Sequence, residues 1–159
     1  MDVLPVESLR ARWLGFGSSL LDLVLPRQCL GCHQVGTLLC ATCTAGIALD
    51  GGNRCPGCLL LSAEGSPCVP CASRTSVHRL LVACDYRQPL VQTAVHQLKY
   101  RALVELARPL GLLLTRYLEH LRNSGSDVGP FGAVIPVPLH RRRELARGYN
   151  QAQLLAEAL

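Results

Sequence analysis

Eight cysteines between residues 29 and 71 form four Cys-x-x-Cys pairs, and they are the clearest chemical feature of this chain. A Cys-x-x-Cys turn directs two thiolates at one point, which supplies half of a tetrahedral metal site. Two turns complete a site, so four turns predict two sites with four sulfur ligands each and no position left for water. Closed sites of this kind are structural rather than catalytic, and the paired spacing is typical of Zn²⁺ ribbons.

The gaps of 7, 11 and 9 residues between the pairs indicate which pairs share a metal ion. The shorter gaps suit ribbon hairpins, so we expect two structural zinc ions, each held by two consecutive pairs. The predicted ligand sets are Cys29, Cys32, Cys40 and Cys43 for one ion, and Cys55, Cys58, Cys68 and Cys71 for the other. An interleaved arrangement also satisfies the spacing. Gly31 and Gly57 lie inside two of the knuckles, where a missing Cβ helps the backbone curl around sulfur.

Disulfides and iron–sulfur clusters use the same side chains and are the alternatives to zinc. Disulfides need an oxidising compartment. The N-terminal stretch has Asp2 and Glu7 where a signal peptide needs positive charge, so we expect a cytoplasmic protein. Iron–sulfur clusters also take four thiolates, but the regular ribbon pairing favours zinc. Cys84, the ninth cysteine, stands alone in an apolar run and is predicted to be a buried strand residue.

Charge is distributed unevenly between the cysteine-rich region and the rest. The formal net charge is +5, and residues 77–159 carry the basic excess. The net charge of residues 26–76 becomes negative, about −3, when the eight thiolates and two zinc ions are included. The ribbons therefore lack the basic patch and stacking aromatics of a nucleic-acid binder, and anions should bind in the C-terminal part. No apolar run reaches ~18 residues, so no membrane span is expected.

Three segments must position these residues: an N-terminal segment 1–26, a double ribbon 27–76 and an α/β segment 77–159. Residues 6–25 are predicted to form an amphipathic helix that ends at Pro26 and packs on the rest of the fold. Its apolar face is Leu9, Trp13, Phe16, Leu20 and Val24. The Gly-, Pro- and Ser-rich ribbons cannot build a large apolar core, so metal should supply their folding free energy.

The order of elements after residue 76 predicts an α/β domain with a parallel sheet. Strands are expected at 77–86 and 133–137. Helices are expected from Pro89 to about Tyr100, from about 103 to 121 with a kink or restart at Pro109, and from Tyr149 or Asn150 onward. Turn-rich and basic loops are expected at 123–132 and 140–147.

The basic loop and the helix that follows it would suit phosphate. Arg141, Arg142, Arg143 and Arg147 come between a strand end and a helix start, and Gly148 permits close backbone approach. Free N–H groups and the helix dipole favour anions at such a start. The alternative is a solvated basic loop.

The segment from Ile135 to Gln151, with its Val-Pro and Arg-Gly-Tyr-Asn-Gln strings, resembles the signature of the ComF/GntX family. These are double-zinc-ribbon proteins with a C-terminal phosphoribosyltransferase-like domain. The cysteine pairs, the Gln97-Leu-Lys-Tyr100 stretch and the Arg147–Gln151 string come in the family's order, so the resemblance covers nearly the whole chain. It implies an N-terminal helix and a small metal-bound double zinc ribbon, followed by the first part of an α/β type I phosphoribosyltransferase-like domain.

The resemblance also implies ligands, partners and site residues. The pyrophosphate-side loop of the family maps onto Arg143, Arg147, Gly148, Tyr149 and Asn150. The implied ligands are phosphoribosyl pyrophosphate or pyrophosphate. The family's role in natural competence and DNA uptake implies single-stranded DNA and competence proteins as partners.

This sequence departs from phosphoribosyltransferases in one respect. They carry two adjacent acidic residues, which hold the ribose hydroxyls, followed by a small-residue loop for the 5-phosphate. No two acidic residues are adjacent in these 159 residues. We therefore expect a C-terminally truncated member that is inactive as a transferase on its own, with unassigned catalytic residues. Mg²⁺ is expected only with a complete transferase domain. The alternative is a zinc-ribbon module that binds single-stranded DNA or another protein without catalysis.

Overall fold

The computed structural model describes residues 26–49, 51–62, 64–126 and 131–159. The helix predicted over 6–25 lies outside them. The described elements are α2 (Ala41–Ala45), the 3₁₀ turn η1 (Val69–Cys71), α3 (Pro89–Tyr100), the 3₁₀ turn η2 (Val104–Leu106), α4 (Ala107–Asn123), α5 (Arg141–Arg147) and α6 (Gln151–Glu157). No helix among these described residues has the length and apolarity needed to cross a lipid bilayer.

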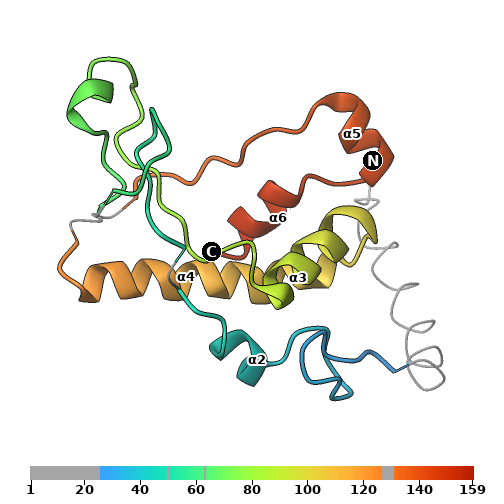
Figure 1. Ribbon diagram of the computed structural model, residues 1–159. Coiled ribbons are helices and arrows are strands. Elements are labelled where there is room, and N and C mark those ends of the chain that lie inside the picture. Colours follow the sequence, from blue (N-terminus) through green and yellow to red (C-terminus); the bar gives the residue numbers. More distant parts are fainter. Residues whose placement is uncertain (1–25, 50, 63, 127–130) are drawn as a thin grey trace, which may run out of the picture.

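The helices α2, α3 and α6 pack on the long helix α4 (Figure 1). Its buried side chains recur every three or four residues, at Leu110, Leu113, Tyr117 and Leu121. This spacing places them on one face of the helix. That face packs against α3 and against apolar residues that follow each cysteine-rich segment, such as Ile47 and Leu81. Helix α4 therefore connects both cysteine-rich segments with the other helices.

Prolines set the starts of α3 and α4. Pro89 is the first residue of α3, where the missing N–H costs nothing. The predicted helix from Pro89 to Tyr100 is confirmed. The predicted 103–121 helix is present as a restart: the η2 turn precedes α4, and Pro109 lies in the first turn of α4.

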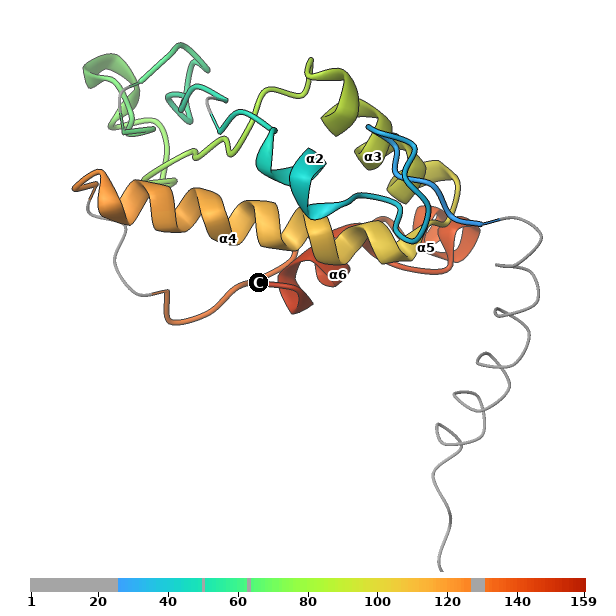
Figure 2. The same ribbon diagram turned by 90° about the horizontal axis from the view of Figure 1, so that it is seen from below.

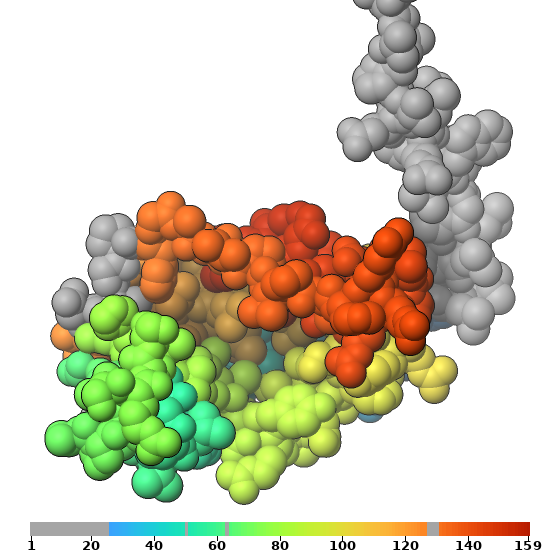
Figure 3. Space-filling model, turned by 90° about the horizontal axis from the view of Figure 1, so that it is seen from above, coloured from blue at the N-terminus to red at the C-terminus, as the bar shows by residue number. Residues whose placement is uncertain are grey.

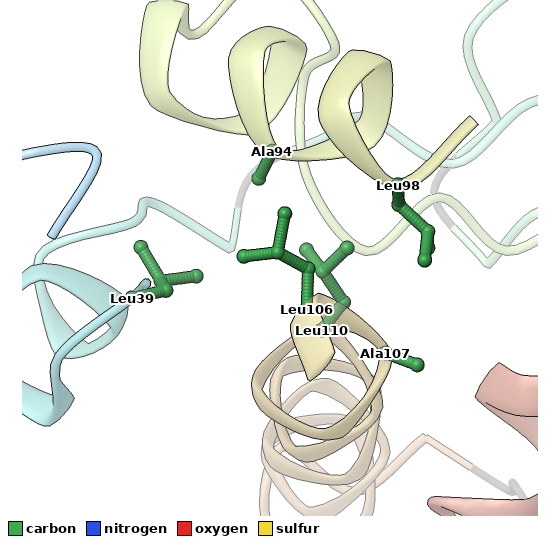
Figure 4. Close-up of a cluster of buried hydrophobic side chains, with 6 residues drawn as sticks. All are labelled: Leu39, Ala94, Leu98, Leu106, Ala107 and Leu110. Atoms are coloured by element: carbon green, nitrogen blue, oxygen red, sulfur yellow. The ribbon is translucent and has the colours of Figure 1, made fainter. Parts of the chain in front are cut away.

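One buried hydrophobic cluster joins the first cysteine-rich segment, which carries Cys29 to Cys43 and is called the first ribbon below, to α3 and α4 (Figure 4). Leu98 and Leu106 are almost completely buried, and Leu39 of the ribbon packs beside them with 4% exposure. The full cluster is Leu39, Ala94, Leu98, Leu106, Ala107 and Leu110. The first cysteine-rich segment therefore shares the main hydrophobic core, although it has little apolar surface of its own.

Helix α6 crosses α4 at a glycine. A Cβ built on Gly111 would lie 2.5 Å from the Cβ of Ala158, closer than two carbons approach, so the two helices can pack here only because Gly111 has no side chain. Leu154 and Leu155 of α6 then reach the main core cluster. The helix predicted from Tyr149 or Asn150 onward is confirmed, with Asn150 as its N-cap.

The two cysteine-rich segments lie at opposite ends of α4 (Figures 1 and 2). The first lies beside the start of α4, because its Leu39 packs in the same cluster as Leu106 and Ala107. The second is held near the other end, where the Tyr117 hydroxyl donates a hydrogen bond to Oδ1 of Asn53. Burial raises the pKa of Tyr117, so this hydroxyl stays a donor at neutral pH.

Both predicted strands are wrong, because no strand forms among the described residues. Within 77–86 there is a single bridge, between Arg54 and Leu80, and Leu81 and Ala83 pack on α4 instead. Within 133–137 the extended chain has no neighbouring strand, and Ile135 is 85% exposed. The Pro residues at 136 and 138 lack the N–H that pairing requires.

The predicted basic loop at 140–147 is also wrong, because residues 141–147 form helix α5. His140 caps it: its Nδ1 accepts the N–H of Arg142 at 3.3 Å. Gly148 ends it in the left-handed region, at φ +81°. Arg, Glu, Leu and Ala favour helices intrinsically, and this preference decides the conformation of the segment.

Candidate functional site

The first four-cysteine cluster is built from a tight turn and the start of α2. Cys29 and Cys32 lie on the turn, whereas Cys40 caps α2 and Cys43 lies inside it. The four sulfur atoms all lie within 4.8 Å of one another. Cys29 is fully buried and Cys32 is exposed, so the cluster lies at the edge of the protein rather than in its core.

The second cluster has the same construction. Cys55 and Cys58 lie on a turn, and Cys68 and Cys71 flank and end the η1 turn. Their sulfurs also lie within 4.8 Å of one another. The predicted grouping of consecutive pairs is therefore confirmed, and the interleaved arrangement is not the one formed.

The two turns are a structural repeat. In the first, the N–H of Cys29 donates to Gln34 O at 2.9 Å and the N–H of His33 donates to Cys29 O at 3.0 Å. In the second, the N–H of Cys55 donates to Leu60 O at 2.8 Å and the N–H of Leu59 donates to Cys55 O at 2.9 Å. Equivalent backbone bonds therefore place equivalent sulfurs.

The two knuckle glycines are also equivalent. A Cβ on Gly31 would lie 2.8 Å from Cys43 Sγ, and a Cβ on Gly57 would lie 2.8 Å from Cys71 Sγ. Neither glycine has a positive φ. Glycine is therefore required at both positions for space beside a sulfur ligand, as predicted for the curl of the backbone.

The sulfur geometry fits a tetrahedral metal ion. Zn–S bonds of about 2.3 Å at tetrahedral angles place neighbouring sulfurs about 3.8 Å apart. Cys32 Sγ and Cys40 Sγ are 3.7 Å apart, and Cys68 Sγ lies 3.7 Å from both Cys55 Sγ and Cys58 Sγ. Each set of four sulfurs could therefore hold one ion with no open position, which is a structural type of site.

The thiols of each cluster differ in acidity. Burial opposes ionisation of Cys29, but nearby backbone N–H groups outweigh it and lower its pKa to about 6. Backbone N–H groups of Cys58 and Cys68 lower the pKa of Cys55 to about 6. The neighbouring cysteines raise the pKa of Cys43 and of Cys71 to about 12. Four thiolates therefore coexist only when a cation neutralises them.

Polar side chains tie the first ribbon to the helices. Arg116 of α4 donates from Nη1 to Thr44 O at 2.8 Å, at the end of α2. Gln88 bonds both backbone groups of Ala48: it accepts from the N–H at 3.1 Å and donates to the carbonyl at 2.9 Å. Hydrogen bonds thus connect the segment that carries the first four-cysteine cluster to the start of α3 and to α4.

A basic hollow forms where α3 ends beside α5 (Figure 3). It has a volume of about 480 Å³ and is lined by Lys99, Tyr100, Arg143, Ala146 and Arg147. Three of its five lining side chains are cationic. The sequence placed Arg143 and Arg147 in a phosphate site, and the structure brings them together with Lys99.

An aromatic ring lies among these cations. The Arg147 guanidinium carbon is 5.2 Å from the Tyr100 ring centroid, and Arg147 also donates to Gln151 Oε1. The ring centroids of His96 and Tyr100 are 4.8 Å apart. Tyr100 nevertheless remains 64% exposed. Lys99 and Tyr100 were not predicted as site residues, and their only sequence signal was the Gln97–Tyr100 stretch.

The other three predicted phosphate-site residues have partners within the fold. The Gly148 N–H donates to Glu144 O at 2.7 Å, and the Tyr149 hydroxyl donates to Leu98 O. Asn150 is buried; its side chain donates to Val137 O at 3.1 Å and accepts the Ala152 N–H at 3.0 Å, which caps α6. These three residues hold α5 and α6 in place, and their contact with phosphate stays a prediction.

Cys84 lies apart from both clusters. It is half-buried and packs against the small cluster of Ile47, Val91 and Leu113. Its predicted burial is thus partly confirmed, although not in a strand. It contributes to neither metal site.

Comparisons with known proteins identify relatives with a shared name. DNA utilization protein YhgH of Escherichia coli strain K12 is 32% identical, over 86% of this chain and 62% of that protein. The proteins of the same name from Shigella flexneri and Salmonella typhimurium strain LT2 are 32% and 33% identical with the same coverage. The chain thus spans less than two thirds of the length of these relatives. No protein-family model and no solved structure matches it.

Proposed function

We propose that this chain binds single-stranded DNA and belongs to the DNA-handling machinery of the cell, with its basic hollow as the phosphate-binding surface. The observation that carries the proposal is the convergence of Lys99 and Tyr100 of α3 with Arg143 and Arg147 of α5 around one hollow. The relatives' name, DNA utilization protein, supports a nucleic acid as the ligand.

The chemistry of the hollow suits single strands. Proteins that bind single-stranded nucleic acids combine cations that follow the backbone with aromatic rings on which bases stack. Lys99, Arg143 and Arg147 supply the cations, and Tyr100 supplies an exposed ring. Base stacking on such a ring contributes about 1–3 kcal/mol.

In this proposal the two four-cysteine clusters bind structural Zn²⁺ and do not contact DNA. Closed four-sulfur sites leave no position for a substrate, and their thiolates add negative charge to the ribbons. The two zinc sites stabilise the fold of the cysteine-rich segments, which bury few apolar side chains of their own. The first ribbon packs on α3 and α4 through Leu39, and Arg116 of α4 donates a hydrogen bond to its Thr44 carbonyl.

Fluorescence anisotropy with a labelled single-stranded oligonucleotide tests the proposal on the zinc-loaded chain. Arg143→Ala and Lys99→Ala should weaken binding, and each should reduce the salt slope by about 0.7 per lost phosphate contact. The matched control is Arg74→Ala, because Arg74 is an exposed arginine of the second ribbon. Equal loss in the control and in the hollow variants would overturn the proposal.

A second candidate places the pyrophosphate of phosphoribosyl pyrophosphate in the same hollow, as the resemblance to phosphoribosyltransferases implies. Two guanidinium groups and an ammonium around one small hollow favour a compact, highly charged anion. Because this sequence lacks the adjacent acidic pair, the chain alone should bind this ligand without turnover. Release of pyrophosphate that depends on the chain and is abolished by Arg147→Ala would refute that expectation.

A further inference from the structure

Helix α4 has an exposed face on the side opposite its buried one. Figure 2 shows α4 with α2 along one side and α6 along the other. Three hollows of about 320, 400 and 450 Å³ follow the exposed face, and neighbouring hollows share lining residues. Leu112 lines the first two and is 51% exposed. The described residues therefore leave a long surface of α4 open.

The side chains of this exposed face follow a heptad pattern. From the η2 turn to the end of α4, residues that line the hollows recur at alternating intervals of three and four positions. They are Glu105, Arg108, Leu112, Thr115, Glu119 and Arg122. These intervals keep the side chains in one stripe, and a stripe of this period is the one along which two helices pack side by side.

The charges of the stripe are arranged symmetrically with opposite sign. Its centre lies between positions 113 and 114, and each charged residue has an oppositely charged one at the same distance on the other side of this centre. The pairs are Arg108 with Glu119, and Glu105 with Arg122. The stripe is therefore complementary to a copy of itself that runs in the opposite direction.

We propose that this face binds a second copy of the chain, with the two α4 helices packed antiparallel about a two-fold axis. In this dimer Arg108 of each copy lies opposite Glu119 of the other, and Glu105 lies opposite Arg122. Parallel helices would instead place Arg108 against Arg108, which is repulsive. Charge complementarity thus selects the occupant of the face and its direction.

The centre of the contact is apolar. Leu112 lies close to the two-fold axis, so both copies place a leucine there. The residues that α2 contributes beside this part of the face are Ala41, Thr44 and Ala45. Their small side chains leave room for a second helix. Burial of the two leucines supplies affinity, and the ion pairs on either side fix the register.

Sedimentation velocity of the full zinc-loaded chain measures the monomer–dimer equilibrium. Leu112→Glu should raise the dissociation constant of the dimer about 10- to 100-fold, because it removes a central leucine from both copies. The control Leu145→Glu changes a leucine on α5 that is 76% exposed and lies outside the face, and it should leave the dissociation constant unchanged. An unmodified chain that is monomeric at concentrations up to about 1 mM would overturn the proposal.

A charge exchange between two chains tests the register. Arg108→Glu and Glu119→Arg each place like charges opposite one another in a homodimer, so each should raise the dissociation constant about 3- to 30-fold. A mixture of the two variants should associate about as tightly as the unmodified chain, because one chain carries glutamate at both positions and the other carries arginine at both.

No contact within one chain reproduces this rescue, because the two positions are about 16 Å apart along the helix. A mixture that associates no better than either variant alone would overturn the proposal. So would association that Leu112→Glu does not weaken, since the contact would then lie outside this face of α4.

Discussion

Gly57→Ala is the substitution that most sharply tests the geometry of the metal clusters. The added Cβ would lie 2.7 Å from Cys71 Cβ and 2.8 Å from Cys71 Sγ. Because Gly57 has no positive φ, alanine brings no backbone strain, and the whole effect comes from this contact. Gly31→Ala makes the equivalent contact with Cys43 Sγ in the other cluster.

The magnitude follows from the distances. Non-bonded heavy atoms settle at about 3.5–4.0 Å, so the Cys71 sulfur must move by about 0.7 Å or more. Ligand distances in metal sites hold to about 0.2 Å. The displaced sulfur therefore leaves its position in the tetrahedron, and we expect the affinity of that site for zinc to fall about 10- to 100-fold.

Competition with a chromophoric chelator measures this loss. Each single variant should lose one tightly held zinc ion and keep the other, and the double variant should lose both. Gly46→Ala is the control, because a Cβ there meets only ordinary contacts at 3.6 Å beside the first cluster. Two zinc ions held with unchanged affinity in Gly57→Ala would refute the reasoning.

The remaining predictions concern protons and stability. Without metal the pKa of Cys43 and of Cys71 is raised to about 12, so zinc binding at pH 7.5 should release at least one proton per site, and the affinity for zinc should increase as the pH rises. Calorimetry in two buffers of different ionisation enthalpy measures this proton release. A binding heat that does not depend on the buffer would contradict the prediction. Leu98→Ala should lower the free energy of unfolding in urea by about 2–5 kcal/mol, and Leu145→Ala by no more than about 0.5 kcal/mol; equal losses would contradict the assigned core. Tyr117→Phe should cost about 0.5–1.5 kcal/mol in the same assay, and no loss would show that its bond to Asn53 is dispensable.

The cysteine clusters and the helices α3, α4 and α6 were predictable from the sequence, for physical reasons. A Cys-x-x-Cys turn fixes its two sulfurs locally, and the shorter gaps favoured the grouping of consecutive pairs; the structure shows that this grouping, and not the interleaved one, is formed. Pro89 and the apolar spacing after it defined α3, and the helix predicted from Tyr149 or Asn150 onward is α6, which the structure shows to be capped by Asn150. In each case the signal lies within a few residues of the element that it specifies.

The strands could not be predicted from local pattern, because a strand exists only when another pairs with it. The apolar runs at 77–86 and 133–137 have strand-like composition, yet Leu81 packs on α4 and Ile135 lies exposed. The described residues therefore do not confirm the predicted α/β sheet, and only the family resemblance still favours it. Helix α5 was missed for the opposite reason, because a run of arginines was interpreted by charge rather than by helix propensity.

Part of the basic hollow was predictable and part was not. Arg143 and Arg147 are close in sequence, so their grouping follows from the chain itself. Lys99 and Tyr100 come from α3, more than 40 positions earlier, and only the packing of α5 against the end of α3 brings them in. The sequence also could not show that the side chain of Asn150 is already occupied within the fold.

Displacement of a labelled single-stranded oligonucleotide by pyrophosphate, at fixed ionic strength, tests the central claim most directly. If the hollow formed by Lys99, Arg143 and Arg147 is a phosphate site, pyrophosphate should displace the oligonucleotide at concentrations at which chloride has no effect. Arg147→Ala should weaken both ligands, and Arg74→Ala should weaken neither. Pyrophosphate that acts no better than chloride at equal ionic strength would contradict the claim and leave only a nonspecific basic surface.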